Sequence, residues 1–190
     1  MPAERIVNYI IEALSKKHNT QGFSCAPNED AVFAEYLHSE ALLDMDLGTA
    51  RTFVAVDQDA PDTDNLCGFF TLRAHSAIIS TGYFEDDMDG EDEDDFIEVP
   101  LIELMFIARD QRWKGAYIGD ALMIEVLKKV AIVASEIGVI GLHLRTTPQG
   151  RNLYERYDFE VFFSHKHHDG ARYILPIQTV RQIVARLDSN

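Results

Sequence analysis

Residues 101–123 read LIELMFIARDQRWKGAYIGDALM, and this stretch predicts how the rest of the chain is organised. An apolar run at 101–108 has the length of a strand, and the charged, glycine-bearing segment 109–119 ends it before an apolar helical pattern begins. We therefore expect a strand, a tight loop and a helix. Such a loop presents backbone N–H groups, and the start of the helix adds unpaired amides and a positive dipole end. A phosphate would bind there; the alternative is an ordinary strand-to-helix connection.

Composition indicates one globular domain. The 190 residues suffice for one buried core, 46% are hydrophobic, and no apolar run approaches the ~18–20 residues of a membrane helix. The N-terminus lacks a signal-peptide layout, so we expect a cytoplasmic protein that does not bind membranes. Cys25 and Cys67 are far apart and outside any CxxC spacing, which argues against a disulfide framework or a metal site.

The charge of the chain is strongly negative and unevenly distributed. The net charge of −15 disfavours non-specific attraction to nucleic acid. Ten carboxylates lie in one stretch at 85–98, EDDMDGEDEDDFIE, which should repel itself and form an extended acidic loop. If this loop borders a binding site, it draws in cations and repels phosphates; the alternative is a solvated loop with no role in binding.

Hydrophobic periodicity and turn residues predict an α/β chain with a mixed sheet flanked by helices. We expect an N-terminal helix within 1–22, a central domain at 23–177 that holds the acidic loop, and a C-terminal helix within 178–190, all in a single domain overall. The expected helices lie at 3–17, 28–47, 118–137, 148–157 and 179–187, and the expected strands at 51–56, 66–79, 101–108, 139–145, 160–163 and 171–175.

Two short motifs resemble those of the GCN5-related N-acetyltransferase (GNAT) family. The loop 114–119, KGAYIG, is similar to its motif A, Q/R-x-x-G-x-G/A, with Tyr117 standing where the family has its middle glycine. The segment 153–159, LYERYDF, resembles its motif B, FYxxxGF, with Asp158 in the glycine position. The stretches at 23–25, 28–47, 50–56 and 68–76 further resemble the bacterial branch that contains toxins acetylating aminoacyl-tRNA. The resemblance implies the GNAT fold.

The resemblance also implies acetyl-CoA as cosubstrate and a set of site residues. The donor's thioester and pantetheine would meet the backbone of Ile107 and Arg109. Tyr154 would be the general acid for the departing thiolate, although a tyrosine packed under the sheet is the alternative. Glu103 would take the amine proton, unless strand alternation turns it to solvent. The pyrophosphate would lie on Lys114, Gly115, Ala116, Tyr117, Ile118 and Gly119.

The expected function is N-acetylation of a primary amine by direct transfer in a ternary complex. The acidic loop favours a cationic small molecule or protein amine as acceptor and speaks against tRNA. His75 would line the acceptor cleft or, as a surface histidine, be merely solvated. Two alternatives remain open: a toxin-like acetyltransferase of aminoacyl-tRNA, and a non-catalytic GNAT-fold module that binds CoA or a protein. A homodimer is also left open.

Overall fold

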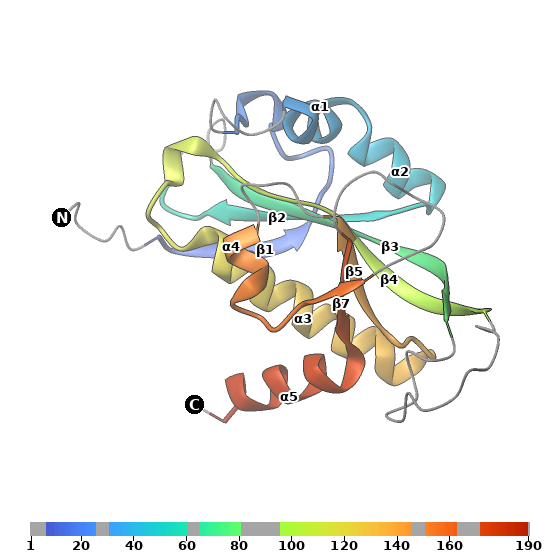
Figure 1. Cartoon of the computed structure of the whole chain (residues 1–190). Helices are drawn as coiled ribbons and strands as arrows, with labels where there is room; N and C mark the ends of the chain where they lie inside the picture. The colour runs from blue at the N-terminus through green and yellow to red at the C-terminus, as the bar shows by residue number, and fades with distance from the viewer. Residues whose placement is uncertain are drawn as a thin grey trace. The chain divides into compact units, whose positions relative to one another are not determined.

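A computed structural model describes residues 7–25, 31–60, 65–80, 96–145, 151–162 and 172–189, and it places seven strands in one sheet (Figure 1). The strand order is β1-β2-β3-β4-β5-β7-β6. The strands are β1 (Tyr9–Ala13), β2 (Arg51–Asp57), β3 (Leu66–Ser80), β4 (Phe96–Arg109), β5 (Gly141–Arg145), β6 (Glu160–Phe162) and β7 (Arg172–Pro176).

The helices confirm the predicted α/β class. They are α1 (Ala31–Ser39), α2 (Ala41–Leu47), α3 (Ile118–Glu136), α4 (Arg151–Glu155) and α5 (Ile177–Leu187), with short 3₁₀ turns η1 (Thr20–Gly22) and η3 (Gln111–Trp113). Neighbouring strands β4 and β5 are joined through α3, a crossover that makes them parallel, whereas β2 and β3 are antiparallel. The sheet is therefore mixed, as expected. Among the described helices, not one has the length and apolarity that crossing a bilayer requires.

The chain divides into two compact units, Met1–Arg73 with Leu104–Lys129, and Ala74–Glu103 with Val130–Asn190. In the first unit, α1 and α2 cover one face of β2 and β3, and the start of α3 covers the other (Figure 1). The strands expected at 51–56 and 66–79 are present as β2 and β3 and pair antiparallel, with buried Val54 opposite buried Phe69. β3 approaches α3 so closely that a Cβ at Gly68 would lie 2.8 Å from the Leu122 side chain.

The helix predicted at 28–47 is divided into two. α1 ends at Ser39, and α2 begins after Glu40, which has no capping side-chain hydrogen bond. The expected end of the helix at residue 47 is confirmed, because Gly48 takes the left-handed conformation, φ 75°, and its N–H bonds the carbonyls of Asp44 and Met45.

The predicted N-terminal helix is wrong over the described residues 7–22. Tyr9–Ala13 is instead a strand, β1, paired antiparallel with β2, with Ile11 opposite Ala55. The apolar spacing that fits a helix also fits a short half-buried strand, and the open edge of β2 offers a full ladder of backbone partners. Tertiary pairing therefore overrides the local pattern.

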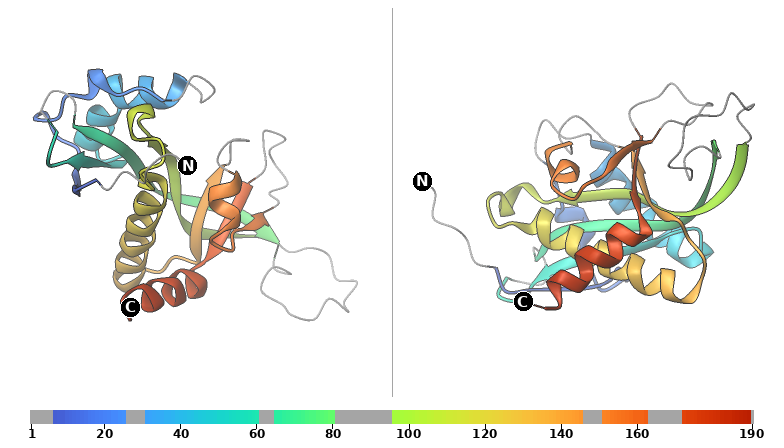
Figure 2. Two further views of the ribbon diagram at one scale, coloured as in Figure 1. Left: turned by 90° about the vertical axis from the view of Figure 1, so that its left-hand side faces the viewer. Right: turned by 60° about the horizontal axis from the view of Figure 1, so that its bottom comes forward.

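In the second unit, β7 pairs antiparallel with both β5 and β6, and Leu142 faces Leu175 across the first pair. α5 (red in Figure 2) packs against β5 and β7 and confirms the predicted C-terminal helix. A small core joins Ile79, Val99, Leu101 and Ile174. Most of the acidic loop, 85–95, lies outside the described residues, whereas Phe96–Glu98 begins β4.

Candidate active site

The loop after β4 is built on the buried carboxylate of Asp110, which is 0% exposed. Its Oδ1 accepts hydrogen bonds from the backbone N–H and Nε of Arg112, at 2.9 and 2.8 Å. Its Oδ2 accepts from Arg112 Nη2 and from the backbone N–H of Ser24, both at 2.9 Å. Four donors, two of them from the Arg112 guanidinium, compensate the cost of burying the charge, so the start of the loop has a fixed conformation.

The following turn, η3, is held to the first unit by its aromatic residue. Trp113 is buried, and its Nε1 donates to Asp57 Oδ2 at 3.3 Å. The Arg112 guanidinium lies 4.7 Å from the Trp113 ring centroid and also donates to the carbonyl of Gly22. This anchoring could not be predicted from the sequence, because Asp57 and Gly22 are remote from Trp113 along the chain.

The turn itself leaves backbone groups accessible. Gly115 and Tyr117 have positive φ, 85° and 52°, and the Tyr117 side chain is 63% exposed. A Cβ added at Gly115 or at Gly119 would meet nothing within 4 Å. The Ala121 N–H bonds the Tyr117 carbonyl, so Tyr117 precedes the first helical residue, and the amides of Ile118 and Gly119 have no partner within α3.

These features suit the pyrophosphate of acetyl-CoA. Open space above two glycines admits a ligand close to the backbone, and unpaired helical amides with a positive dipole end attract phosphate. Of the other residues predicted for the donor, Lys114 is exposed, Ala116 is buried, and Ile107 and Arg109 are half-buried on β4. Arg109 Nη1 donates to the Asp110 carbonyl at 3.2 Å. The loop's role in binding the donor remains a prediction.

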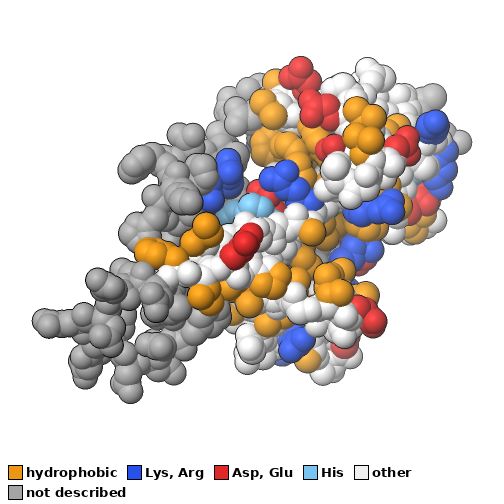
Figure 3. All heavy atoms as spheres, turned by 90° about the vertical axis from the view of Figure 1, so that its right-hand side faces the viewer, with side chains coloured by type: hydrophobic (Ala, Val, Ile, Leu, Met, Phe, Trp, Pro, Cys, Tyr) orange, Lys and Arg blue, Asp and Glu red, His pale blue; other side chains and the backbone are white. Residues whose placement is uncertain are grey.

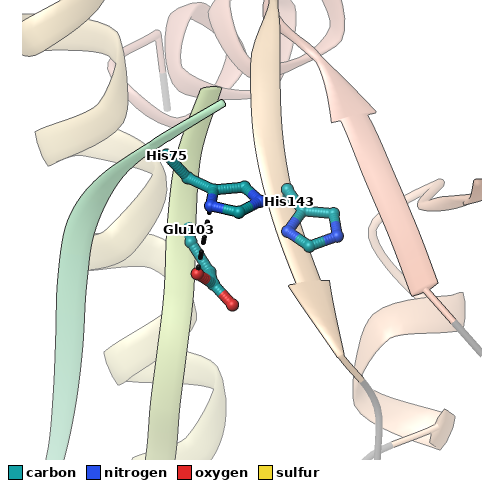
Figure 4. Close-up of side chains that lie close together, drawn as sticks. All are labelled: His75, Glu103 and His143. Carbon is teal, nitrogen blue, oxygen red and sulfur yellow. Dashed lines mark ion pairs between the residues drawn. The ribbon is translucent and has the colours of Figure 1, made fainter. Parts of the chain in front are cut away.

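The second unit brings together three side chains that are distant in sequence, His75 on β3, Glu103 on β4 and His143 on β5 (Figure 4). Glu103 is only 5% exposed, so of the two expected orientations it takes the buried one. Its Oε2 lies 3.7 Å from Nδ1 of His75, whose side chain is 26% exposed. The rings of His75 and His143 lie nearly parallel, 5.2 Å between centroids.

His143 could not be identified from the sequence, because one histidine in a strand of alternating residues gives no signal until the strand order is known. Burial lowers the pKa of His143 to about 4, against a smaller opposing effect of the Glu103 carboxylate; His75, Arg172 and Arg145 lower it further. At neutral pH this imidazole is therefore uncharged.

Among the described residues, these three side chains also form a group that could hold a metal ion, because their ligand atoms lie within 4.8 Å of one another. A tetrahedral Zn²⁺ with bonds of about 2.0–2.2 Å needs ligand atoms closer than that, about 3.3–3.6 Å apart. Arg172 and Arg145 also act on His143 with positive charge, which opposes a cation. The cluster suits proton transfer better than metal binding.

Tyr154, the predicted general acid, is at the end of the second unit's short helix α4. It is 6% exposed, and its ring meets Phe159 edge-on at 5.7 Å between centroids. Burial raises its pKa to about 12, which keeps the phenol protonated at neutral pH, as an acid requires. Asp158, between them in sequence, has a positive φ of 58°.

Basic groups reach the surface despite the negative total. On the face shown in Figure 3, histidine (pale blue) is visible beside Lys and Arg side chains (blue), and Asp and Glu (red) are interspersed among them. The net charge of −15 is therefore compatible with positively charged side chains on parts of the described surface.

Comparisons with known proteins agree with the fold. No protein-family model matches the chain. A probable toxin TacT of Sinorhizobium fredii is 25% identical over 187 residues, covering 92% of this chain and 94% of the relative. A tyrosine-to-phenylalanine variant of KacT superposes with a TM-score of 0.72 at 17% identity, covering 92% of this chain and 98% of that one.

A further solved structure, AtaT complexed with acetyl-methionyl-tRNAfMet, superposes with a TM-score of 0.73 at 14% identity and covers 93% of this chain and 99% of that one. At 92–93% coverage of this chain, these matches extend over both units. The chain therefore has the GNAT fold that its motifs predicted, and it resembles the bacterial toxin branch of that family over nearly its whole length.

Proposed function

We propose that the chain is an acetyl-CoA-dependent N-acetyltransferase that acetylates a primary amine directly, in a ternary complex. The observation that carries the proposal is the turn between β4 and α3, where two open glycines and the amides of Ile118 and Gly119, which have no partner within α3, offer a phosphate site without help from side chains. We assign acetyl-CoA as the phosphate-bearing ligand of this site because of the GNAT-fold neighbours and the motif resemblance.

The donor is bound mainly by backbone. Gly115, Ala116, Tyr117, Ile118 and Gly119 hold the pyrophosphate, with Lys114 adding an exposed positive charge beside it. The strand β4 offers backbone groups at Ile107 and Arg109 to the pantetheine arm. Because most of these contacts are independent of side chains, Tyr117 in place of a glycine is compatible with binding.

Tyr154 and Glu103 carry the two proton transfers. The Tyr154 phenol, kept protonated by burial, gives its proton to the departing thiolate of CoA. Glu103, buried beside His75, takes the proton that the amine loses as the amide forms. Support for the tyrosine comes from the motif around it and from KacT, which was solved as a variant lacking one tyrosine hydroxyl.

Two classes of amine compete as acceptor. The structural neighbour AtaT is complexed with acetyl-methionyl-tRNAfMet, which favours the α-amine of an aminoacyl-tRNA. The net charge and the acidic stretch at 85–98 favour a cationic small molecule or a basic protein. Acetyl-CoA and charged tRNA are both cytoplasmic molecules, which places the proposed reaction in the cytoplasm.

The test is transfer of labelled acetyl from acetyl-CoA, with thiol release followed in parallel. Charged total tRNA, a polyamine and a lysine-rich peptide are offered separately, each at low and at physiological salt. We expect label on one acceptor class with one thiol released per acetyl transferred, and loss of both signals in Tyr154→Phe. Thiol release without labelled product would indicate hydrolysis, and neither signal with any amine would refute the proposal.

A further inference from the structure

We propose that His75 receives from Glu103 the proton that the acceptor amine loses and releases it to solvent, while His143 positions the His75 ring. This inference rests on the proposed acetyl transfer and adds two residues to it. Its basis is the arrangement of three side chains on three adjacent strands, shown in Figure 4.

The exposure of the three side chains sets the direction of the transfer. Glu103 is almost fully buried, so a proton that it accepts has no direct route to bulk water. His75 lies beside it, with Nδ1 at 3.7 Å from Oε2, and retains 26% of its side-chain surface in contact with solvent. A shift of well under 1 Å, or one bridging water, brings the pair to hydrogen-bond distance. His75 is thus both close to Glu103 and in contact with solvent.

His143 is suited to hold the ring rather than to take the proton. It is 1% exposed and lies parallel to His75 at 5.2 Å. Burial keeps it neutral at pH 7, with a pKa of about 4, so it does not compete with His75 for the proton. The charged groups that act on this imidazole are Glu103 and His75, with Arg172 on β7 and Arg145 on β5, and neither guanidinium titrates near neutral pH.

The step balances in protons and charge. The amine nitrogen forms a bond to the acetyl carbon and loses one proton to Glu103, and the C–S bond breaks to give a thiolate. Glu103 passes its proton to Nδ1 of neutral His75, and the Nε2 proton leaves to solvent, so Glu103 is again a carboxylate and His75 is neutral with its proton on Nδ1. Exchange of that proton with water then restores the tautomer protonated on Nε2 before the next turnover. Tyr154 protonates the thiolate and is reprotonated from water. An acceptor that arrives as an ammonium ion loses its extra proton by the same route.

The experiment compares His75→Gln, Glu103→Gln and His143→Phe with a matched control, His18→Gln. His18 also pairs with a carboxylate, Nε2 to Glu12 Oε1 at 2.9 Å, but it belongs to the first unit and to no such cluster. We expect His75→Gln to lower kcat with the active acceptor at least about tenfold at pH 7, with KM for acetyl-CoA unchanged. Added imidazole should restore much of the activity of His75→Ala, and the control should retain full activity.

The basicity of the acceptor amine provides a readout that would not change if His75 had only a structural role. Two peptides of one sequence are used, one with a free lysine amine, pKa about 10.4, and one with only a free α-amine, pKa about 7.7–8.0. The more basic amine holds its proton more tightly, so its acetylation should be reduced more by His75→Gln. Equal reduction for both peptides, or unchanged kcat in His75→Gln, would overturn the role of His75 while leaving acetyl transfer intact.

A measurement independent of activity completes the test. Histidine ring signals are followed by NMR across pH in the unchanged protein and in Glu103→Gln. Loss of the carboxylate should move the His75 titration to lower pH, because a neighbouring anion stabilises imidazolium. An unmoved titration means that the pair is not coupled, and the inference fails whatever the activity. If the unchanged protein transfers no acetyl group to any amine, the proposed function fails and the inference falls with it.

Discussion

Replacing Gly119 with alanine should raise the stability of the folded protein and weaken its binding of acetyl-CoA. We expect both effects from one added methyl group. Gly119 is the second residue of α3, it is not among the glycines with positive φ, and a Cβ there would meet nothing within 4 Å. Alanine is therefore accommodated without strain. Within a helix, alanine is more stable than glycine by about 0.5–1 kcal/mol. For a chain of this size we expect the melting temperature to rise by about 1–3 °C.

The same open space is where the pyrophosphate is proposed to approach the backbone. A methyl group there keeps phosphate oxygens away from the amides of the first helical turn. We expect at least about tenfold weaker binding, equivalent to about 1.4 kcal/mol. At a ligand concentration of 100 times the original Kd, acetyl-CoA stabilises the unchanged protein by about 2.7 kcal/mol, and the variant by about 1.4 kcal/mol. The ligand-induced rise in melting temperature should therefore fall by about half.

Gly138→Ala is the matched control. Gly138 also has open space at its Cβ position and no positive φ, but it follows α3 instead of beginning it. Thermal unfolding with and without acetyl-CoA, and calorimetric titration, should show both variants as stable as the parent or slightly more so. Only Gly119→Ala should lose affinity. Equal affinity in all three proteins would refute binding of pyrophosphate at this turn, and a destabilised Gly119→Ala would refute the geometry.

Three further predictions concern other parts of the proposed site. Tyr154→Phe should lower kcat about 10²-fold or more with the Kd for acetyl-CoA little changed; unchanged kcat would mean that Tyr154 is only a packing residue. Because the pKa of Tyr154 is about 12, kcat of the unchanged protein should not fall through deprotonation of this phenol below about pH 11. Asp110→Asn should lower the free energy of unfolding by about 2–3 kcal/mol in chemical denaturation, because the Arg112 guanidinium loses its buried counter-charge, whereas a loss under about 0.5 kcal/mol would mean that the loop is held elsewhere. Replacing the carboxylates of 85–98 with Ser and Asn should lower kcat/KM for a cationic acceptor and flatten its salt dependence, and should leave activity on tRNA unchanged or higher; no response with either acceptor would separate this stretch from the reaction.

The sequence predicted those elements whose signals are local. The strand, turn and helix around 101–123 carry apolar periodicity and glycines, and the structure places β4, the loop and α3 there. It misjudged 9–13, where pairing with β2 decides between helix and strand, and the break at Glu40, which has neither glycine nor proline to signal it. Local patterns do not report which edge of a sheet is free.

The candidate site shows the same limit. Glu103 could be singled out as a carboxylate in an apolar strand, because burying it is costly without a partner. The partner could not be identified, since His75 and His143 meet Glu103 only through the register of three strands joined by long connections. Asp110 could not be identified for the same reason: three of its donors belong to Arg112, two positions along the chain, but the fourth belongs to Ser24, which is 86 positions away.

The two departures from the family motifs support a loop that still binds its ligand. Tyr117 and Asp158 stand where the motifs have glycine, and among the described residues they are the two non-glycine positions with positive φ. A left-handed conformation costs about 1–2 kcal/mol for a residue with a Cβ, somewhat less for aspartate. If the turn bound no ligand, relaxing to negative φ would lower the free energy of the folded protein. Both backbones instead keep the conformation that glycine adopts freely, and the Tyr117 side chain is directed to solvent, 63% exposed. The backbone shape that the proposed phosphate site requires is thus preserved although the glycines are gone, which weighs against a module that has lost its donor.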